Sequence, residues 1–118
     1  MTEFSPVIEF LKDLKKLNKK YKSLNDDLTK NFCEALEAVL PNYLRGTFQI
    51  SDLGEDVKIP IYKVKHFRCE ALKGMGCRSG IRIIYAYEQD KDKVTLIEIY
   101  HKTKQENHDK KRILKYFS

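Results

Sequence analysis

Cationic side chains recur at alternate positions in the strand-like segments of the second half of the chain. Lys63 and Lys65 lie two residues apart in segment 59–69, and Arg82 lies in segment 80–88. Residues two apart on a strand point to the same face of a sheet. Fixed cations bind phosphate, and they stabilise the negative charge that builds up when a ribose 2′-hydroxyl attacks a phosphodiester. These residues therefore predict a phosphate-binding face that is able to cleave RNA without a metal.

A third strand-like segment, residues 93–102, extends this face. The polar turn at Asp90-Lys91-Asp92 predicts that it pairs with segment 80–88 as an antiparallel hairpin. One register places Tyr100 and Lys102 beside the three cations on an exposed face. An aromatic ring can stack on an unpaired base, and Lys, His or Tyr can act as acid or base. The alternative is an exposed sheet face whose lysines are simply solvated.

Two amphipathic helices precede these strands and would cover the other sheet face. Ser5-Pro6 has the pattern of a helix start, and Pro41 ends a second helix after a joint near residues 23–26. A short strand is expected within 47–51 and a short final helix within 106–117. We therefore expect an α+β domain spanning residues 1–118. It would have an N-terminal helical hairpin packed on an antiparallel β-sheet of about four strands.

Inside the predicted sheet, alternation assigns side chains to faces. Ile81, Ile83 and Tyr85 should lie under the helices, and Ile97 and Ile99 are expected on the same side. Phe67 is expected to share the face of the lysines.

Composition supports a single ordered domain with an acidic partner. The chain has 118 residues and a net charge of +6, which favours nucleic acid as a partner. No apolar run approaches the roughly 20 residues of a membrane-spanning helix. The first residues lack the pattern of a secretory signal, so we expect a cytoplasmic protein with no membrane contact.

The three cysteines, Cys33, Cys69 and Cys77, do not form a paired disulfide pattern. Cys69 and Cys77 flank a glycine-bearing loop near His66, which leaves a metal site as an alternative. Ordinary reduced thiols are the favoured interpretation, and we expect neither a metal nor another cofactor.

Short motifs in this order resemble those of a known family. The string IYKVK at 61–65 resembles the Y-K-[IV]-K strand of RelE-type toxins, and GIRIIYAY at 80–87 resembles their G-x-R-[LIV]-[LIV]-Y strand. The apolar stretch 94–100, followed by His101 and Lys102, resembles their last strand. With the paired helices in front, the resemblance to the RelE/ParE toxin superfamily, in its RelE-like branch, covers nearly the whole chain.

The resemblance implies a function and a set of residue roles. It implies a toxin of a type II toxin–antitoxin system that cleaves mRNA on the ribosome by 2′-hydroxyl attack. Lys63 and Lys65 would activate the attacking group and bind phosphate, and Arg82 would stabilise the transition state. Lys102 falls where RelE has another catalytic arginine, and it lacks the bidentate guanidinium.

Histidines mark the departures from the RelE pattern. His108 falls where RelE has its catalytic tyrosine, and a histidine can serve as general acid or base. Tyr116 is a possible substitute for that tyrosine. A second branch, similar to YoeB, ends its last strand in Tyr-His-Tyr, which makes His101 a further catalytic candidate. However, alternation points His101 away from Lys63.

The loop between Lys65 and Gly80 is longer than in RelE. It carries Arg68, Lys73 and Arg78, which we expect to extend the RNA-binding surface; the alternative is a solvated loop.

Three functions remain in competition. The first is the ribosome-dependent endoribonuclease, favoured by Lys63, Lys65 and Arg82. The second is a ParE-like inhibitor of DNA gyrase, which shares the fold but does not cleave. The third is a non-catalytic nucleic-acid-binding module, favoured by the departures at Lys102 and His108. The toxin hypotheses imply a cognate antitoxin as partner, acidic where it meets the lysines, and the first also implies the ribosome and mRNA.

Overall fold

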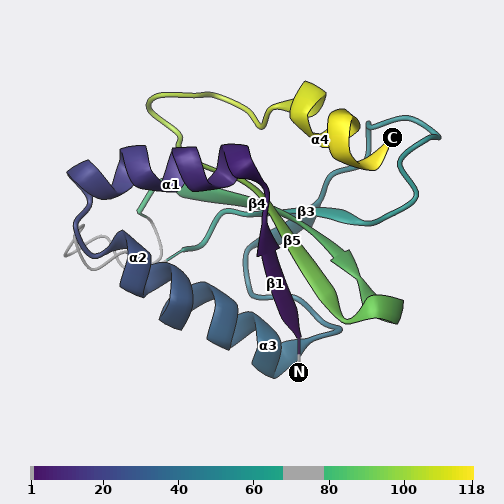
Figure 1. Cartoon of the computed structure of the whole chain (residues 1–118), viewed down its shortest axis with the longest axis horizontal. Helices are drawn as coiled ribbons and strands as arrows, with labels where there is room; N and C mark the ends of the chain where they lie inside the picture. The colour runs from purple at the N-terminus through teal and green to yellow at the C-terminus, as the bar shows by residue number, and fades with distance from the viewer. Residues whose placement is uncertain (1, 68–78) are drawn as a thin grey trace.

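The computed structural model describes residues 2–67 and 79–118. Its centre is a mixed five-stranded sheet in the order β1-β5-β4-β3-β2 (Figure 1). β1 is parallel to β5, and the other neighbours are antiparallel. The strands are β1 (Glu3–Pro6), β2 (Thr47–Gln49), β3 (Ile61–Val64), β4 (Ile81–Glu88) and β5 (Lys93–His101).

β1 was not anticipated from the sequence. Ser5 and Pro6 were expected to begin a helix, but they pair in register with Thr95 and Leu96 of β5. Pro6 is tolerated there because it ends an edge strand. The first helix begins two residues later, and the Val7 amide donates to the Leu96 carbonyl at 3.0 Å. The predicted helical hairpin therefore follows a strand instead of opening the fold.

The helices form two groups on opposite sides of the sheet. α1 (Ile8–Lys20) is followed by a continuous helical segment made of α2 (Leu24–Asp27), a wider π-helical stretch (Leu28–Glu34) and α3 (Ala35–Val39). α4 (Lys110–Phe117) closes the chain, capped by the Asp109 side chain, which accepts from the Arg112 amide. No helix among the described residues is long and apolar enough to cross a membrane.

The first two helical segments cover one face of the sheet. Ile81, Ile83 and Tyr85 of β4 are buried beneath them, as alternation predicts. Phe32 meets Tyr85 edge-on with ring centroids 5.5 Å apart. Phe67 also joins this core, contrary to the expectation that it lies beside the lysines. The alternation pattern fails for Phe67 because β3 ends at Val64.

The opposite face is covered at one end only. α4 and the segment 50–60 bury Ile61, Ile84 and Ala86 beneath Ile113 and Leu53. A β-bulge shifts the register between β4 and β5, so that Ile84 pairs with Glu98 and Tyr85 with Leu96. Because of this extra residue, Ile97 joins the core under α4 instead of lying under the helices with Ile99 as expected.

Candidate active site

Three cations meet at the uncovered end of this second sheet face. Lys63 lies on β3, Arg82 on β4, and Lys65 directly follows β3. The Arg82 guanidinium donates to the Lys65 carbonyl at 3.1 Å. Burial lowers the pKa of Lys63, and the charges of Lys65 and Arg82 lower it further. The structure therefore brings together the three cations that the sequence placed on one face.

Strand pairing fixes this arrangement. Lys63 pairs with Ile84, whose side chain lies in the core under α4, so Lys63 points to that face. Tyr62 and Val64 point the other way, into the core under the helices. Lys63 is half-buried and Lys65 is exposed, which leaves the cations accessible at the rim of a packed surface.

A buried carboxylate stands beside these cations. Glu98 on β5 pairs with Ile84 and has only 2% of its surface exposed. Burial raises its pKa, and hydrogen bonds oppose this shift. Its carboxylate accepts from the Asp109 amide at 2.8 Å and from the Gln105 side chain at 2.6 Å. Glu98 thus ties the segment 102–109 to the sheet. This role could not be predicted from the residue pattern, because the donors come from an irregular segment.

His108 lies in this segment, close enough to Lys63 for the lysine charge to affect the pKa of the histidine. Burial lowers the pKa of His108, the charge of Lys63 lowers it further, and Asp52 opposes this. Among the described residues, the buried Nδ1 atom has no hydrogen-bond partner. With its pKa below the usual value, the imidazole is neutral near pH 7 and can accept a proton.

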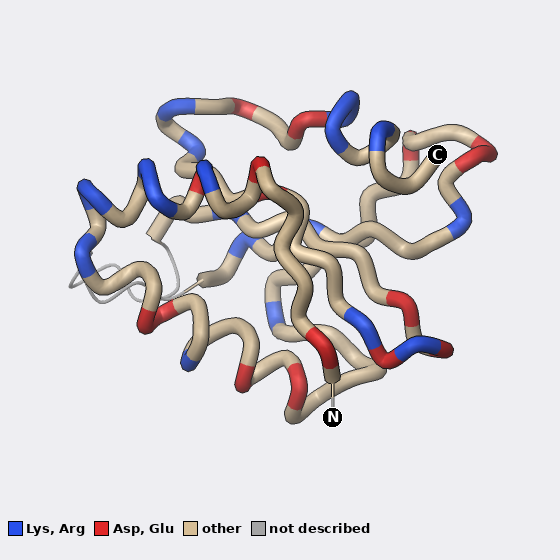
Figure 2. The backbone as a smooth tube through the Cα atoms, viewed as in Figure 1, with Lys and Arg blue, Asp and Glu red and all other residues tan. Residues whose placement is uncertain are grey.

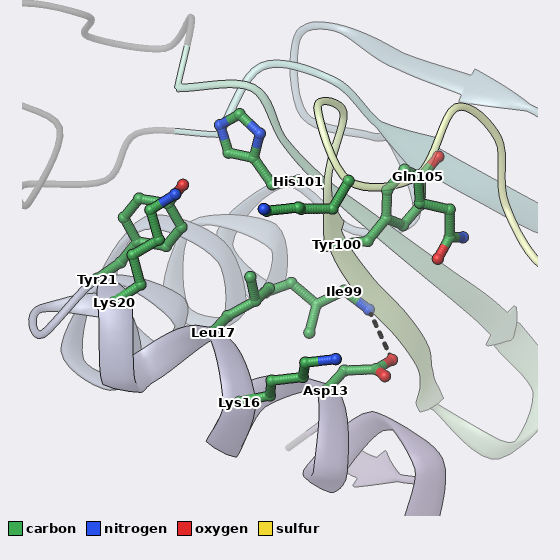
Figure 3. A pocket seen from close by; sticks show the side chains of 10 residues that line it. Asp13, Lys16, Leu17, Lys20, Tyr21, Ile99, Tyr100, His101 and Gln105 are labelled. Carbon is green, nitrogen blue, oxygen red and sulfur yellow. Dashed lines mark hydrogen bonds between the residues drawn. The ribbon is translucent and has the colours of Figure 1, made fainter.

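His101 lies on the other side of β5, in a pocket between this strand and α1 (Figure 3). Its Nδ1 accepts from the Thr103 amide at 3.2 Å, and its Nε2 therefore donates to the Ser79 carbonyl at 3.0 Å. The ring stacks on Tyr21 with centroids 5.7 Å apart. The pocket measures about 460 Å³, and its rim includes Lys16, Lys20 and Lys104.

The structure also describes three other candidates, Tyr100, Lys102 and Tyr116. Tyr100 was expected to be exposed, but it is 6% exposed because α4 packs on it, and burial raises its pKa to about 12. Lys102 is exposed beyond the end of β5, where its amide donates to the Gly80 carbonyl at 2.9 Å. Tyr116 donates to Glu9 on α1 at 2.5 Å, so it is held away from the cations.

Phe48 on β2 was not singled out from the sequence, although a short strand was expected there. It pairs directly with Lys63 and is 54% exposed. The Lys65 ammonium lies 4.9 Å from the centre of its ring. The sequence carries no signal for this role, because neither the exposure of Phe48 nor its pairing with Lys63 can be read from it.

The loop candidates Arg68, Lys73 and Arg78 lie outside the described residues, as do Cys69 and Cys77. His66, considered with those cysteines, lies against the backbone of Gly46, which has a positive φ of 82°. Within residues 2–67 and 79–118, His, Cys, Asp and Glu form no group of three that could hold a metal ion.

The charges of the chain are unevenly distributed. Lys and Arg follow α1, whereas Asp and Glu are more frequent toward α3 and the start of β1 (Figure 2). The lysines of α1 lie over the first sheet face, so they form a basic region separate from the cations on the second face.

Two solved structures of the Escherichia coli RelE toxin are similar to this chain. The isolated toxin is 22% identical, with 86% of this chain and 84% of that chain covered and a TM-score of 0.49. A RelE variant with two arginines replaced by alanine, in the free state, is 23% identical, with 89% and 87% covered and a TM-score of 0.50. No family model and no curated protein matches the chain. The chain thus has a RelE-like α+β fold.

Proposed function

We propose that this protein belongs to the RelE/ParE superfamily and is the toxin of a type II toxin–antitoxin system. Its activity in this proposal is ribosome-dependent cleavage of mRNA in the cytoplasm. The RelE-like fold and the basic sheet face support the assignment. The observation that carries the proposal is the convergence of Lys63, Lys65 and Arg82 at the open end of that face.

The cluster suits transition-state stabilisation. In cleavage by internal attack, the 2′-oxygen bonds to phosphorus and the bond to the 5′-oxygen breaks. The products are a 2′,3′-cyclic phosphate and a 5′-hydroxyl. Negative charge builds on the non-bridging oxygens, and the planar guanidinium of Arg82 can bind two of them at once. Lys63 and Lys65 add fixed positive charge at a partly desolvated surface, where it acts more strongly than in water.

His108 is the proposed general base. Its imidazole is neutral near pH 7, the charge of Lys63 acts on it, and Nε2 would take the proton of the 2′-hydroxyl because Nδ1 is buried. One lysine ammonium of the pair at positions 63 and 65 returns a proton to the departing 5′-oxygen. The proton balance then closes without a metal or a cofactor.

The proposal also implies partners. A cognate antitoxin would neutralise the toxin by covering the basic face, and it should be acidic where it meets Lys63 and Lys65. The ribosome would present the mRNA, and Arg68, Lys73 and Arg78, between Lys65 and Gly80 in the sequence, would add phosphate contacts.

A non-catalytic binding role or ParE-like gyrase inhibition is the second candidate. It is favoured by the departures from the RelE pattern at Lys102, which lacks the bidentate guanidinium of the arginine that the resemblance implies, and at His108.

Induced expression in a bacterial host, followed by mapping of mRNA 5′ ends, tests the proposal. Cuts within translated codons that disappear in Arg82→Ala, with the fold retained, are the expected result. Growth arrest with intact mRNA and inhibited gyrase would instead support the ParE-like function. Absence of both effects would leave the binding module.

A further inference from the structure

We propose that Phe48 forms a nucleobase subsite, where an unpaired RNA base stacks beside the phosphate bound by Lys63 and Lys65. This inference rests on the proposed function, because it assigns to the same face a second ligand group. β2 contributes the ring, and β3 contributes the charges.

The Phe48 ring and the ammonium groups of Lys63 and Lys65 are close enough to contact one nucleotide together. Phe48 and Lys63 are directly paired across β2 and β3, so their side chains are neighbours on one face. Lys65 Nζ lies 4.9 Å from the ring centre. A phosphate on these ammonium groups would leave its own base beside the ring.

The exposure of Phe48 is what sets it apart from the other aromatic side chain on this face. Phe48 is 54% exposed, whereas Tyr100 is 6% exposed beneath α4. Stacking needs an open ring, because the base must lie flat on it. The Lys65 ammonium lies over one face of the ring, and in this proposal the base stacks on the ring surface that remains exposed. An exposed phenylalanine amid cations is costly to hydrate, and a base would remove this surface from water.

Charge selects RNA over an apolar protein partner as the occupant. The lysines beside the ring would be desolvated without compensation against an apolar surface, and a phosphate compensates them. Aromatic stacking combined with backbone cations is the usual basis for binding single-stranded nucleic acid.

The test measures binding of a short single-stranded RNA whose 2′-hydroxyls are methylated, which prevents cleavage by internal attack. A 2-aminopurine base reports stacking by fluorescence quenching. Phe48→Leu should weaken binding about 5- to 150-fold and abolish the quenching, because one stacked base is lost. Phe48→Trp should restore both. The salt dependence of binding should stay unchanged, since no charge is removed.

A matched control is available on the other face. Tyr43 is 55% exposed, nearly the same as Phe48, but its ring packs against Tyr62 in the core under the helices. Tyr43→Leu should leave RNA binding unchanged. Lys63→Ala, by contrast, should weaken binding and reduce the salt dependence.

The possible failures are distinguishable. If the wild-type protein binds the RNA but Phe48→Leu binds equally well with equal quenching, the subsite is wrong and the proposed function stands. If the wild-type protein binds no free RNA, the subsite is wrong, and the proposed function is decided separately by cleavage of mRNA on the ribosome. If Phe48→Leu instead abolishes capture of an antitoxin while RNA binding is unaffected, the occupant is a protein, and the subsite is likewise wrong.

Discussion

Each side of β5 has a histidine near lysine side chains, but the two histidines differ in their surroundings. On the helical side, His101 lies among lysines in the pocket beside α1, and on the other side His108 lies beside Lys63. Burial is the main cause of a lowered pKa in both histidines. Residue types and pKa directions therefore do not separate the two regions.

Hydrogen bonding separates them. Both ring nitrogens of His101 have partners, and its ring is stacked on Tyr21. His108 has a buried Nδ1 without a partner among the described residues, and it adjoins cations on a face left half-open by α4. His101 has the surroundings of a structural residue. Because Nδ1 of His108 is buried, only Nε2 of this half-buried ring can meet a substrate and take its proton.

The largest expected effect lies at Arg82. Arg82→Ala should lower the cleavage rate about 10²- to 10³-fold, the usual cost of losing one donor to a developing oxyanion. Arg82→Lys should cleave at a rate between those of the wild-type protein and Arg82→Ala, because the charge remains but the bidentate hydrogen-bond geometry is lost. Timed cleavage of mRNA on purified ribosomes measures both. Lys104→Ala, in the pocket beside α1, serves as control, and an equal loss there would remove the distinction between the two regions.

The two histidines should respond differently. His108→Ala should lower the cleavage rate about 100-fold, as expected for loss of a general base. His101→Ala should instead lower the free energy of unfolding by about 1–2 kcal/mol through its lost hydrogen bonds, with little change in rate. Rate measurements and urea unfolding separate these outcomes. A slower His101 variant beside an unaffected His108 variant would reverse the assignment.

The pH dependence of cleavage is a second test of His108 as the general base. Its pKa lies below the ordinary 6.5, so the neutral base persists at neutral pH. Cleavage should stay constant near pH 7 and fall as the pH drops through a midpoint below 6.5. This acid limb should vanish in His108→Ala and remain in His101→Ala. A pH–rate profile of each variant decides the point, and an acid limb that survives in His108→Ala would assign it to another group.

A smaller effect is expected at Glu98, a positioning residue. In Glu98→Gln the amide cannot accept from both the Asp109 amide and Gln105, and one donor loses its partner. Cleavage should slow about 10-fold, and stability should fall by about 1 kcal/mol. The acid midpoint should move toward 6.5 as His108 becomes more hydrated. Glu55→Gln at an exposed position should change neither quantity measurably. An unchanged midpoint in Glu98→Gln would mean that Glu98 does not position His108.

The smallest effect is expected at Tyr116. Tyr116→Phe removes only the hydrogen bond to Glu9 between α4 and α1. The cleavage rate should be unchanged, and the free energy of unfolding should fall by no more than about 1 kcal/mol. A large loss of rate would instead indicate that Tyr116 takes part in cleavage.

Sequence patterning predicted the elements that have strong periodicity. Strands β3, β4 and β5 and the face of Lys63 and Arg82 follow from alternation, because strand pairing preserves a period of two. β1 was missed because its four residues gain stability only by pairing with β5, which lies about ninety residues away in the sequence. Local propensity at Ser5-Pro6 favoured a helix and was overridden by this tertiary pairing.

The expectations for Ile97 and Tyr100 were wrong for a similar reason, because both positions depend on structure outside the alternation of one strand. Alternation assumes unbroken pairing, and one extra residue moved Ile97 to the opposite core. Tyr100 was assigned to the correct face but not to the correct depth, because the docking of α4 is not encoded in the strand itself. Glu98 and Phe48 depend on segments 102–109 and 47–49, whose positions relative to the cations only the fold specifies.

The most direct test of the central claim compares two double variants that remove the same net charge from opposite sides of β5. One is Lys63→Ala with Arg82→Ala, and the other is Lys20→Ala with Lys104→Ala. Each is added to purified ribosomes carrying a defined mRNA, and the cleaved fraction is measured over time. We predict that the first variant leaves the mRNA intact and that the second cuts at nearly the wild-type rate. Cleavage by the first variant, or its loss only in the second, would contradict the assignment of the active site to the Lys63–Arg82 face.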